Sequence, residues 1–350
     1  LTGSGISVTG VTKAVCGHPA IARAMLDGGV VGLAESRLTN VERLRSGGIM
    51  SPIVMIRTPV PSQSGRIARN CDASYNTEID VIRRLASAAR RTGNTHGIIL
   101  MVEMGDMRDG IMPEDVAAVA QQVSDLPGVL LKGIGANFAC LNGMVPNAMV
   151  MARFSALASQ VESAIGSRFE AVSGGNSANI PWALVHGARS RVNDLRLGEA
   201  ILLGVDPVSG TRIDGLHTDA FTLVAEIIET KAKTAPVHRF STRPSWPPLK
   251  LVAVNDQPMR SILAVGEQDT DVAGLSMPDG ILFVGGTSDH LVVQNSRLRL
   301  AVGSEVSFQM NYAALMRAMN APDVCKVLHN AIPFPAVTPS PHGGRFLETA

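Results

Sequence analysis

The chain has 350 residues, of which 45% are hydrophobic and 17% are charged, so it has enough apolar material for a sizeable core. Its formal net charge of +1 gives no electrostatic reason to expect a nucleic acid or an anionic membrane as a partner. Aromatic residues make up 4% of the chain, which argues against base stacking as a mode of binding.

The first two thirds of the chain alternate between strand-like and helix-like segments. Short apolar runs predict strands at 6–13, 30–35, 51–57, 71–75, 97–103, 129–134, 169–173 and 194–197. Apolar residues at helical spacing predict helical segments at 19–27, 40–45, 78–91, 113–123, 148–165 and 180–188. Alternating strands and helices predict a parallel sheet, and eight such units over about 200–250 residues predict a closed (β/α)₈ barrel.

The pattern changes after about Ala235. Prolines between Pro236 and Pro248 interrupt helices, and strand-like runs follow at 249–254, 262–265, 281–284 and 291–294. Glycine-rich and aspartate-rich turns separate these runs, which predicts an antiparallel β domain. We therefore expect a barrel domain over 1–235 and a smaller β domain over 236–350. A helix is expected at 312–319, and the proline-rich tail from Ile332 is expected to be irregular.

The cysteines and histidines suggest neither a disulfide framework nor a metal site. The four cysteines are scattered without CxxC pairs, which favours reduced thiols in a cytoplasmic protein. The histidines fall in no HxH or HExxH spacing, so we expect no metal. No apolar run approaches the ~20 residues of a membrane span. The chain begins at Leu1 without a methionine, which leaves a preceding targeting segment open.

Lys13 ends the first expected strand, within the sequence ISVTGVTKAVCG from Ile6 to Gly17. Burying an ammonium group without a partner is costly. Burial also lowers the pKa of a lysine, and its neutral amine can then form a Schiff base with an aldehyde. Lys13 is therefore a candidate covalent anchor for pyridoxal 5'-phosphate (PLP). Taken alone, a lysine whose ammonium group extends from the strand end into solvent is the simpler interpretation.

In barrels of this kind the chemistry lies at the carboxyl ends of the strands. Those positions hold one lysine, several arginines and two glycine-containing turns, which fits a phosphorylated ligand. The turn from Ser173 through Gly174, Gly175 and Asn176 to Ser177 follows the seventh strand. It opens a helix, where backbone N–H groups and the helix dipole favour an anion. A flexible turn capped by Asn176 or Ser177 is the alternative.

Five motifs occur in order at the ends of the expected strands: VTKAVCG, LMVEMGDMRDG, GIGANF, SGGNSA and LRLGEAILLG. Together they resemble the PLP-dependent racemases of the alanine-racemase-like barrel fold, in particular the branch of ornithine and predicted amino-acid racemases. The resemblance is strong from Ile6 to Gly204 and continues through GEQDTDVAGL and GGTSDHLVV. It implies PLP as the cofactor, an amino acid as the substrate and a homodimer whose active sites are shared between the chains.

The resemblance also assigns roles to particular residues. Lys13 would bind PLP covalently and act as one acid and base, and Arg196 would face the pyridine nitrogen. Arg108 would lie near the phenolic oxygen of the cofactor and meet the substrate carboxylate, and Asn137 would take part beside it. The phosphate group would be held in the turn that begins at Ser173 and by the next loop, through Gly175, Asn176, Ser177, Gly198 and Glu199.

The expected reaction interconverts L- and D-amino acids by exchange of the Cα proton between two bases. An arginine at the pyridine nitrogen stays protonated and leaves that nitrogen without a proton. The cofactor is then a weaker electron sink, which discourages transamination and decarboxylation and favours two-base exchange. The resemblance places the second base in the β domain of a partner chain. The candidates by residue type are Asp269, Asp271, Asp289, His290 and Tyr312, each of which also has an ordinary structural interpretation.

Three departures from the alanine racemase pattern bear on the substrate. Asn137 stands where alanine racemases carry a ring-facing histidine, and Met101 stands where many carry a lysine. Cys16, Gly17 and His18 replace the usual tyrosine after the catalytic lysine. These departures argue against a plain alanine racemase. Three acidic residues can attract the cationic end of ornithine or another basic amino acid, or they can instead form a solvated loop or pair with Arg108: Glu103, Asp106 and Asp109.

Three other functions are compatible with the same residues. A PLP-dependent lyase or decarboxylase would use the same lysine on the same barrel. A non-catalytic PLP-binding protein would resemble the isolated barrel, so the expected β domain argues against it. A barrel without PLP would leave Lys13 with a structural role.

Overall fold

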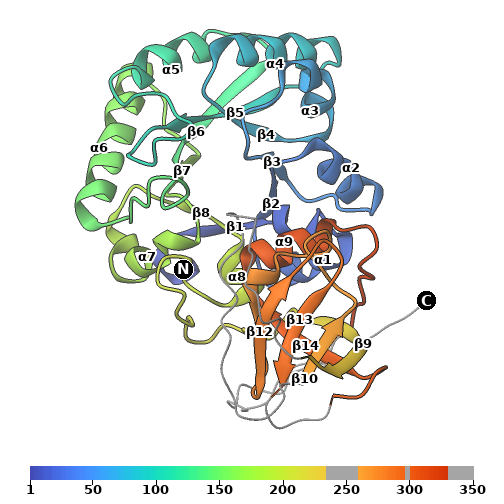
Figure 1. Cartoon of the computed structure of the whole chain (residues 1–350). Coiled ribbons are helices and arrows are strands. Elements are labelled where there is room, and N and C mark those ends of the chain that lie inside the picture. The colour runs from blue at the N-terminus through green and yellow to red at the C-terminus, as the bar shows by residue number, and fades with distance from the viewer. Residues whose placement is uncertain (234–258, 296–299, 330–350) are drawn as a thin grey trace, which may run out of the picture. The chain divides into compact units, whose positions relative to one another are not determined.

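The computed structural model describes residues 1–233, 259–295 and 300–329, and the chain folds as two compact units (Figure 1). The units comprise Leu1–His217 and Thr218–Ala350. The strand expected at 249–254 and the proline-rich tail from Ile332 lie outside the described residues.

The first unit is a closed barrel of eight parallel strands, in the order β1 to β8, as the sequence predicts (Figure 1). Pairing of β1 with β8 closes it, with Gly10 opposite Leu197. The strands are β1 Ser7–Val11, β2 Gly32–Glu35, β3 Ile53–Met55, β4 Ala73–Asn76, β5 His96–Val102, β6 Val129–Ala136, β7 Ala171–Ser173 and β8 Asp194–Leu197.

Helices follow the strands around the outside of the barrel. They are α1 Pro19–Asp27, α2 Leu38–Ser46, α3 Ser64–Asn70, α4 Ile79–Arg91, α5 Val116–Ser124, α6 Ala148–Ile165, α7 Ile180–His186 and α8 Glu199–Leu203. Short 3₁₀ turns add η1 Thr2–Ser4, η2 Lys13–Val15, η3 Pro61–Gln63, η4 Ser177–Asn179 and η5 Gly187–Arg189. Two details differ from expectation. The sequence predicts no helix where α3 and α8 lie, and Pro113 precedes α5 instead of opening it.

The helix α4 illustrates how the barrel is covered. Ile82, Leu85 and Ala89 recur at helical spacing and are fully buried. The strand β5 is buried on both faces, and Ile98 and Leu100 are also fully buried. Burial of each large aliphatic side chain contributes roughly 1.5–3 kcal/mol. The barrel interior is therefore a packed core, and polar side chains are left to gather at its ends.

The second unit is built on a six-stranded sheet in the order β11-β14-β9-β10-β13-β12, and every described pair is antiparallel. Its elements are β9 Leu223–Ala232, β10 Met259–Leu263, η6 Val272–Gly274, β11 Leu275–Ser276, β12 Ile281–Gly286, β13 Leu291–Asn295, β14 Glu305–Met310 and α9 Tyr312–Asn320. Because β9 pairs with β10 and β14, the division between the units falls at His217 and Thr218, before the expected boundary at 235 and 236.

Within the described ranges of the chain, no helix combines the length and the apolar character needed to cross a lipid bilayer.

A buried histidine lies in the barrel wall. His96 begins β5 and is 1% exposed. Its Nε2 atom lies 2.8 Å from the Oγ atom of Ser74 on the neighbouring strand β4. Burial lowers the pKa of His96 to about 4, because the charged ring would lose its hydration. The ring is therefore neutral in the folded protein at any pH well above this value.

We predict that His96 makes the barrel sensitive to mild acid. The pKa of His96 is about 4 in the folded protein and about 6.5 in the unfolded chain. At pH values between these two, His96 binds a proton in the unfolded chain but not in the folded protein. The contribution of neutral His96 to the stability of the fold is present above pH 6.5 and is lost as the pH falls toward 4. From pH 7 to pH 5.5 the free energy of unfolding should fall by about 1 kcal/mol more in the wild type than in His96→Gln. Urea unfolding at both pH values measures this difference. Equal decreases in the free energy of unfolding for the wild type and His96→Gln would contradict the prediction.

Candidate active site

Lys13 lies beyond β1 instead of inside it, in contrast to the expected strand at 6–13. The strand ends at Val11, and Lys13 is the first residue of η2. The turn continues through Cys16 and Gly17, whose φ angles are 54° and 59°. A Cβ atom on Gly17 would lie 2.7 Å from a backbone oxygen of α2, so only glycine allows this close approach. The turn therefore fixes where the side chain of Lys13 begins.

The charges around Lys13 show which loops surround it. Burial is the main cause that lowers the pKa of Lys13. The nearby Cys140 raises this pKa, Arg108 lowers it, and Glu35 and Glu199 raise it. Cys140, Arg108 and Glu199 follow β6, β5 and β8, and Glu35 is the last residue of β2, so the ends of four strands lie within electrostatic range of one amine. A lowered pKa increases the neutral fraction of the amine, which is its nucleophilic form.

Glu35 supports the turn that carries Lys13. Its side chain is fully buried, and Oε1 accepts a hydrogen bond from Oγ1 of Thr12 (3.1 Å). Its other oxygen, Oε2, accepts from the backbone N–H groups of Ser36 (2.8 Å) and Arg37 (3.2 Å) and from the amide of Asn40 (3.2 Å). Burial raises the pKa of Glu35, and these hydrogen bonds oppose that rise. Both carboxylate oxygens are thus engaged in connecting the Lys13 turn to α2.

Arg196 is the most deeply buried cation at this end of the barrel, at 4% exposure. Its Nη1 donates to Ser173 Oγ (2.6 Å) and Tyr75 OH (3.2 Å), and its Nη2 donates to Ala136 O (2.7 Å) and Asn137 Oδ1 (2.8 Å). Its guanidinium carbon also lies 4.5 Å from the centre of the Tyr75 ring. Among the described residues, the Nε–H group of Arg196 has no acceptor. One donor of the guanidinium is therefore left for a ligand.

The charge of Arg196 is balanced through a hydroxyl group. Ser173 Oγ accepts from Arg196 and donates to Oδ2 of Asp194, whose Oδ1 accepts from Thr9 Oγ1 (2.7 Å). A buried charge is tolerated when hydrogen bonds and a nearby opposite charge compensate it. This arrangement holds the guanidinium in one orientation.

The glycine turn after β7 is closely packed. Gly175 has a φ angle of 101°, and a Cβ atom there would lie 2.7 Å from the ring of Phe138. Asn176 donates through Nδ2 to the backbone oxygen of Phe138 (2.8 Å) and accepts from the N–H group of Ala178 (3.0 Å). The side chain of Asn176 is therefore used to hold the turn, and only its backbone is available to an anion.

Two neighbouring turns present backbone N–H groups together. The N–H group of Ala200 donates to Ser177 Oγ (3.2 Å), which connects the loop after β8 with the loop after β7. Ser177 and Gly198 are buried, yet in the described part of the chain their backbone N–H groups, and those of Asn176 and Glu199, have no protein acceptor. Buried N–H groups are almost always hydrogen-bonded. These turns therefore form a site for an anionic acceptor.

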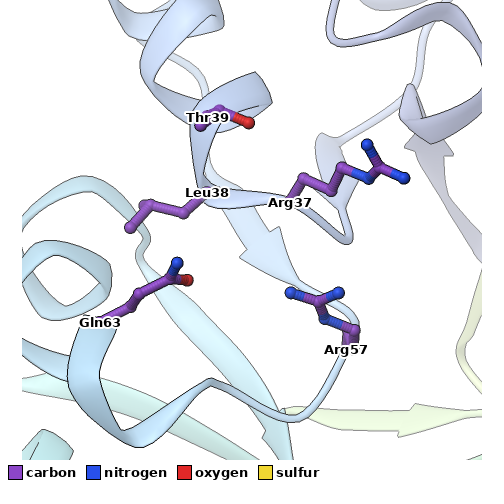
Figure 2. Close-up of a pocket in the computed structure, with 5 residues that line it drawn as sticks. All are labelled: Arg37, Leu38, Thr39, Arg57 and Gln63. Atoms are coloured by element: carbon purple, nitrogen blue, oxygen red, sulfur yellow. The ribbon is translucent and has the colours of Figure 1, made fainter. Parts of the chain in front are cut away.

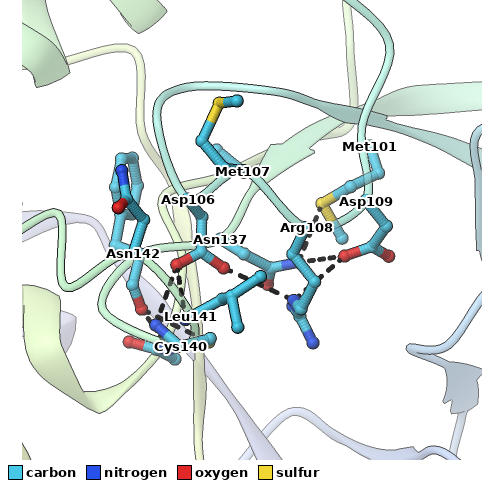
Figure 3. Close-up of polar contacts among 12 residues, drawn as sticks. Met101, Asp106, Met107, Arg108, Asp109, Asn137, Cys140, Leu141 and Asn142 are labelled. Carbon is cyan, nitrogen blue, oxygen red and sulfur yellow. Dashed lines mark hydrogen bonds and ion pairs between the residues drawn. The ribbon is translucent and has the colours of Figure 1, made fainter.

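Arg108 lies in the loop after β5, between two carboxylates (Figure 3). Its Nε atom lies 3.4 Å from Asp106 and 3.2 Å from Asp109. Asn137 donates to Asp109 (3.4 Å) and lies 3.4 Å from the sulfur of Met101, while its oxygen accepts from Arg196. Asn137 therefore contacts Arg196 directly and is connected to Arg108 through Asp109.

A separate pocket of about 240 Å³ lies at the ends of β2 and β3 (Figure 2). In Figure 2 the guanidinium group of Arg57 and the amide of Gln63 face the same space. The pocket is lined by Arg37, Leu38, Thr39, Arg57 and Gln63, a set that does not include Lys13 or the residues expected to hold phosphate.

The expected residues of the barrel thus meet at one end of it, whereas the candidates for the second base belong to the other unit. There, Oδ2 of Asp269 accepts from a backbone N–H group within its own turn (2.9 Å), and Asp289 accepts from the hydroxyl of Thr287 (3.2 Å). Asp271 lies 3.7 Å from Arg317. The role of second base remains a prediction for the whole set: Asp269, Asp271, Asp289, His290 and Tyr312.

Tyr75 and Asp194 are not among the expected site residues, and the structure places both around Arg196. An acidic residue at the start of the apolar run 194–197 is the one signal that could have drawn attention to Asp194. Tyr75 ends the expected strand at 71–75, but its contact with Arg196 depends on how the barrel closes.

The family model "Alanine racemase, N-terminal domain" matches residues 2–207. A lysine racemase from Thermotoga maritima is 32% identical over 332 residues, covering 94% of this chain and 92% of that protein. An ornithine racemase from Acetoanaerobium sticklandii is 29% identical and covers 91% of both. A solved alanine racemase from Clostridium difficile 630 has a TM-score of 0.69 at 20% identity, covering 89% of this chain and 86% of that chain, which shows a shared fold.

The chain therefore belongs to the alanine racemase family, as its motifs predict. Its similarity to the lysine and ornithine racemases extends over both units.

We predict that Gly175→Ala weakens binding of a phosphate group in the turn after β7. The new methyl group would meet Phe138, and the φ angle of 101° is unfavourable for alanine. The turn should shift, and the Kd for PLP, measured by titration of the cofactor-free protein, should rise about tenfold, which corresponds to about 1.4 kcal/mol. Gly143→Ala is a matched control, because its φ angle is 65° but its Cβ atom would meet nothing within 4 Å. Equal Kd values for the two variants would contradict the prediction.

Proposed function

We propose that this protein is an amino-acid racemase that uses PLP and acts on a diamino acid. Membership of the alanine racemase family and the racemases that match over nearly the whole chain support the activity. The observation that carries the proposal is the meeting, at one end of the barrel, of a lysine with a lowered pKa and two turns with unsatisfied N–H groups. A lysine and an ornithine racemase among the relatives support the substrate class.

The donors present fit the chemical groups of PLP. The aldehyde requires a neutral amine, which Lys13 supplies because burial lowers its pKa. The phosphate requires N–H donors, which the turns at Ser177 and Gly198 supply. The pyridine nitrogen requires a donor, and the remaining Nε–H group of Arg196 can provide it. We therefore assign these residues to the cofactor.

The residues around Lys13 suit exchange of a proton at the substrate Cα. PLP, when bound, withdraws electrons from the Cα atom and so makes its proton acidic. The Nζ atom of Lys13 can accept and return a proton, because its pKa lies below the usual value. Arg108 uses Nε for its own two aspartates, so its Nη groups are available for the substrate carboxylate. Asn137 positions Arg196 through its oxygen.

The base opposite Lys13 is expected from the second unit of a partner chain, so we propose a homodimer with shared active sites. The support is the family resemblance and the set of acidic, histidine and tyrosine candidates in that unit. The four free cysteines suit the reducing environment of the cytoplasm, where we place the protein.

The proposal is tested by incubating the purified protein with PLP and single L-amino acids in D₂O. With L-lysine or L-ornithine we expect loss of optical rotation together with deuteration at Cα, without loss of the amino acid. Release of CO₂ or of a cleavage product would identify a decarboxylase or lyase instead. Binding of PLP without any turnover would identify a non-catalytic PLP-binding protein.

We predict that Lys13→Ala reduces racemisation by about 10³-fold or more, because the proton would lose its acceptor and donor on one face. Lys132→Ala is the matched control, since Lys132 forms an ion pair with Glu170 (2.9 Å) on the barrel wall. Chiral chromatography of the product measures both rates. A Lys13→Ala variant that racemises at the control rate would remove Lys13 from the mechanism.

A further inference from the structure

Three acidic residues on the loop after β5 can be distinguished by what their oxygens contact. Glu103 is fully used within the loop. Its Oε1 accepts from the backbone N–H groups of Gly105 and Met107 (3.0 Å to the latter), and its Oε2 accepts from the N–H group of Arg108 (3.4 Å). Glu103 therefore shapes the loop and has no free oxygen for a ligand.

Asp106 is also used by the protein, but it keeps its charge inside the site. It is 2% exposed, and Oδ1 accepts from the backbone N–H groups of Cys140 (2.9 Å) and Leu141 (3.0 Å) on the loop after β6. Its Oδ2 atom is buried without a hydrogen bond and lies 3.4 Å from Nε of Arg108. Asp106 thus connects two loops and holds Arg108 from one side (Figure 3).

Asp109 differs from both, because one of its oxygens is available. Oδ1 lies 3.2 Å from Arg108 Nε and accepts from the amide of Asn137 (3.4 Å). Among the described residues no group contacts Oδ2, and the side chain is 30% exposed. In Figure 3 this carboxylate lies on the opposite side of Arg108 from Asp106.

The charges of this group do not cancel. Asp106 and Asp109 carry two negative charges and Arg108 carries one positive charge, so one negative charge remains. The other cations nearby have their own carboxylates. Arg196 is connected to Asp194 through Ser173, and Lys13 is within range of Glu35 and Glu199. Of the two Oδ2 atoms in this group, that of Asp109 is the one on a partly exposed side chain, so it is the oxygen open to a cationic ligand.

We infer that Asp109 determines substrate specificity by binding the side-chain ammonium of a diamino acid through Oδ2. This inference rests on the proposed racemase activity and adds the residue that selects the substrate. Arg108 takes the α-carboxylate through its Nη groups, while its Nε atom holds Asp109 in place. A neutral side chain would leave Oδ2 of this partly buried carboxylate without a partner in place of water, which disfavours its binding.

The test compares substrates that differ only in the ammonium group. Lysine and norleucine form one pair, and ornithine and norvaline form the other. For the wild type we expect kcat/KM for the diamino acid to exceed that for its neutral counterpart by about 100-fold. In Asp109→Asn, kcat/KM for lysine should fall by at least about 30-fold, mainly through KM, and that for norleucine should change less than about threefold. Asparagine keeps the Oδ1 acceptor, so Arg108 and Asn137 retain their contacts.

Asp125→Asn, at the exposed end of α5, is the control and should match the wild type with both substrates. Equal losses for lysine and norleucine in Asp109→Asn would show that Asp109 only supports the loop and would overturn the inference. A wild type that racemises both substrates equally would also overturn it, while leaving the racemase assignment intact. Absence of racemisation with every amino acid would instead refute the proposed function.

Discussion

Pairing of the first strand with the last is the constraint on which the site depends. Gly10 of β1 lies opposite Leu197 of β8, so the turn after β1 comes next to the loop after β8. The approach is close, because a Cβ atom on Gly198 would lie 3.2 Å from the side chain of Val11. Lys13 and the unsatisfied N–H groups at Ser177 and Gly198 are far apart in the sequence. Closure of the barrel is what makes them neighbours.

Near the pairing of β1 with β8, burial and hydrogen bonding determine how the charged side chains of the site are held. Arg196 is held by hydroxyl, carbonyl and amide oxygens, and its carboxylate, Asp194, is reached only through Ser173. The guanidinium therefore keeps a fixed orientation, with one donor left for a ligand. Lys13, by contrast, lies where burial lowers its pKa. One end of the barrel thus provides both a permanent cation and an amine that readily loses its proton.

Much of the fold follows from the sequence for clear physical reasons. Strands of a parallel barrel are buried on both faces, so they appear as short apolar runs, and α1, α6 and β8 have the expected bounds. The helix α3 was missed because only Ser64, Ile67 and Ala68 are buried in it, which gives a weak apolar pattern. The strand β9 shows clear alternation, with Leu223, Ala225 and Ile227 buried, but the prolines from Pro236 onward predict a later start of the β domain.

The site was predictable in its positions but not in its pairings. Lys13, Arg196 and Ser177 could be chosen because each lies at or near the carboxyl end of an expected strand. The contact of Arg196 with Tyr75 joins residues 121 positions apart, and no local pattern encodes it. Nor could the sequence separate Glu103 from Asp109, because their roles depend on which oxygens face the loop backbone. Only the folded loop shows that the oxygens of Glu103 are used by the loop backbone while one oxygen of Asp109 is open.

The central claim is that the amine of Lys13 carries the cofactor at the junction of β1 and β8. Reduction of the PLP-treated protein with borohydride, followed by peptide mapping by mass spectrometry, tests it most directly. The account predicts one pyridoxyl-phosphate group per chain, located on Lys13, with resistance to tryptic cleavage at that residue. A label located on another lysine, or no label on any peptide, would contradict it.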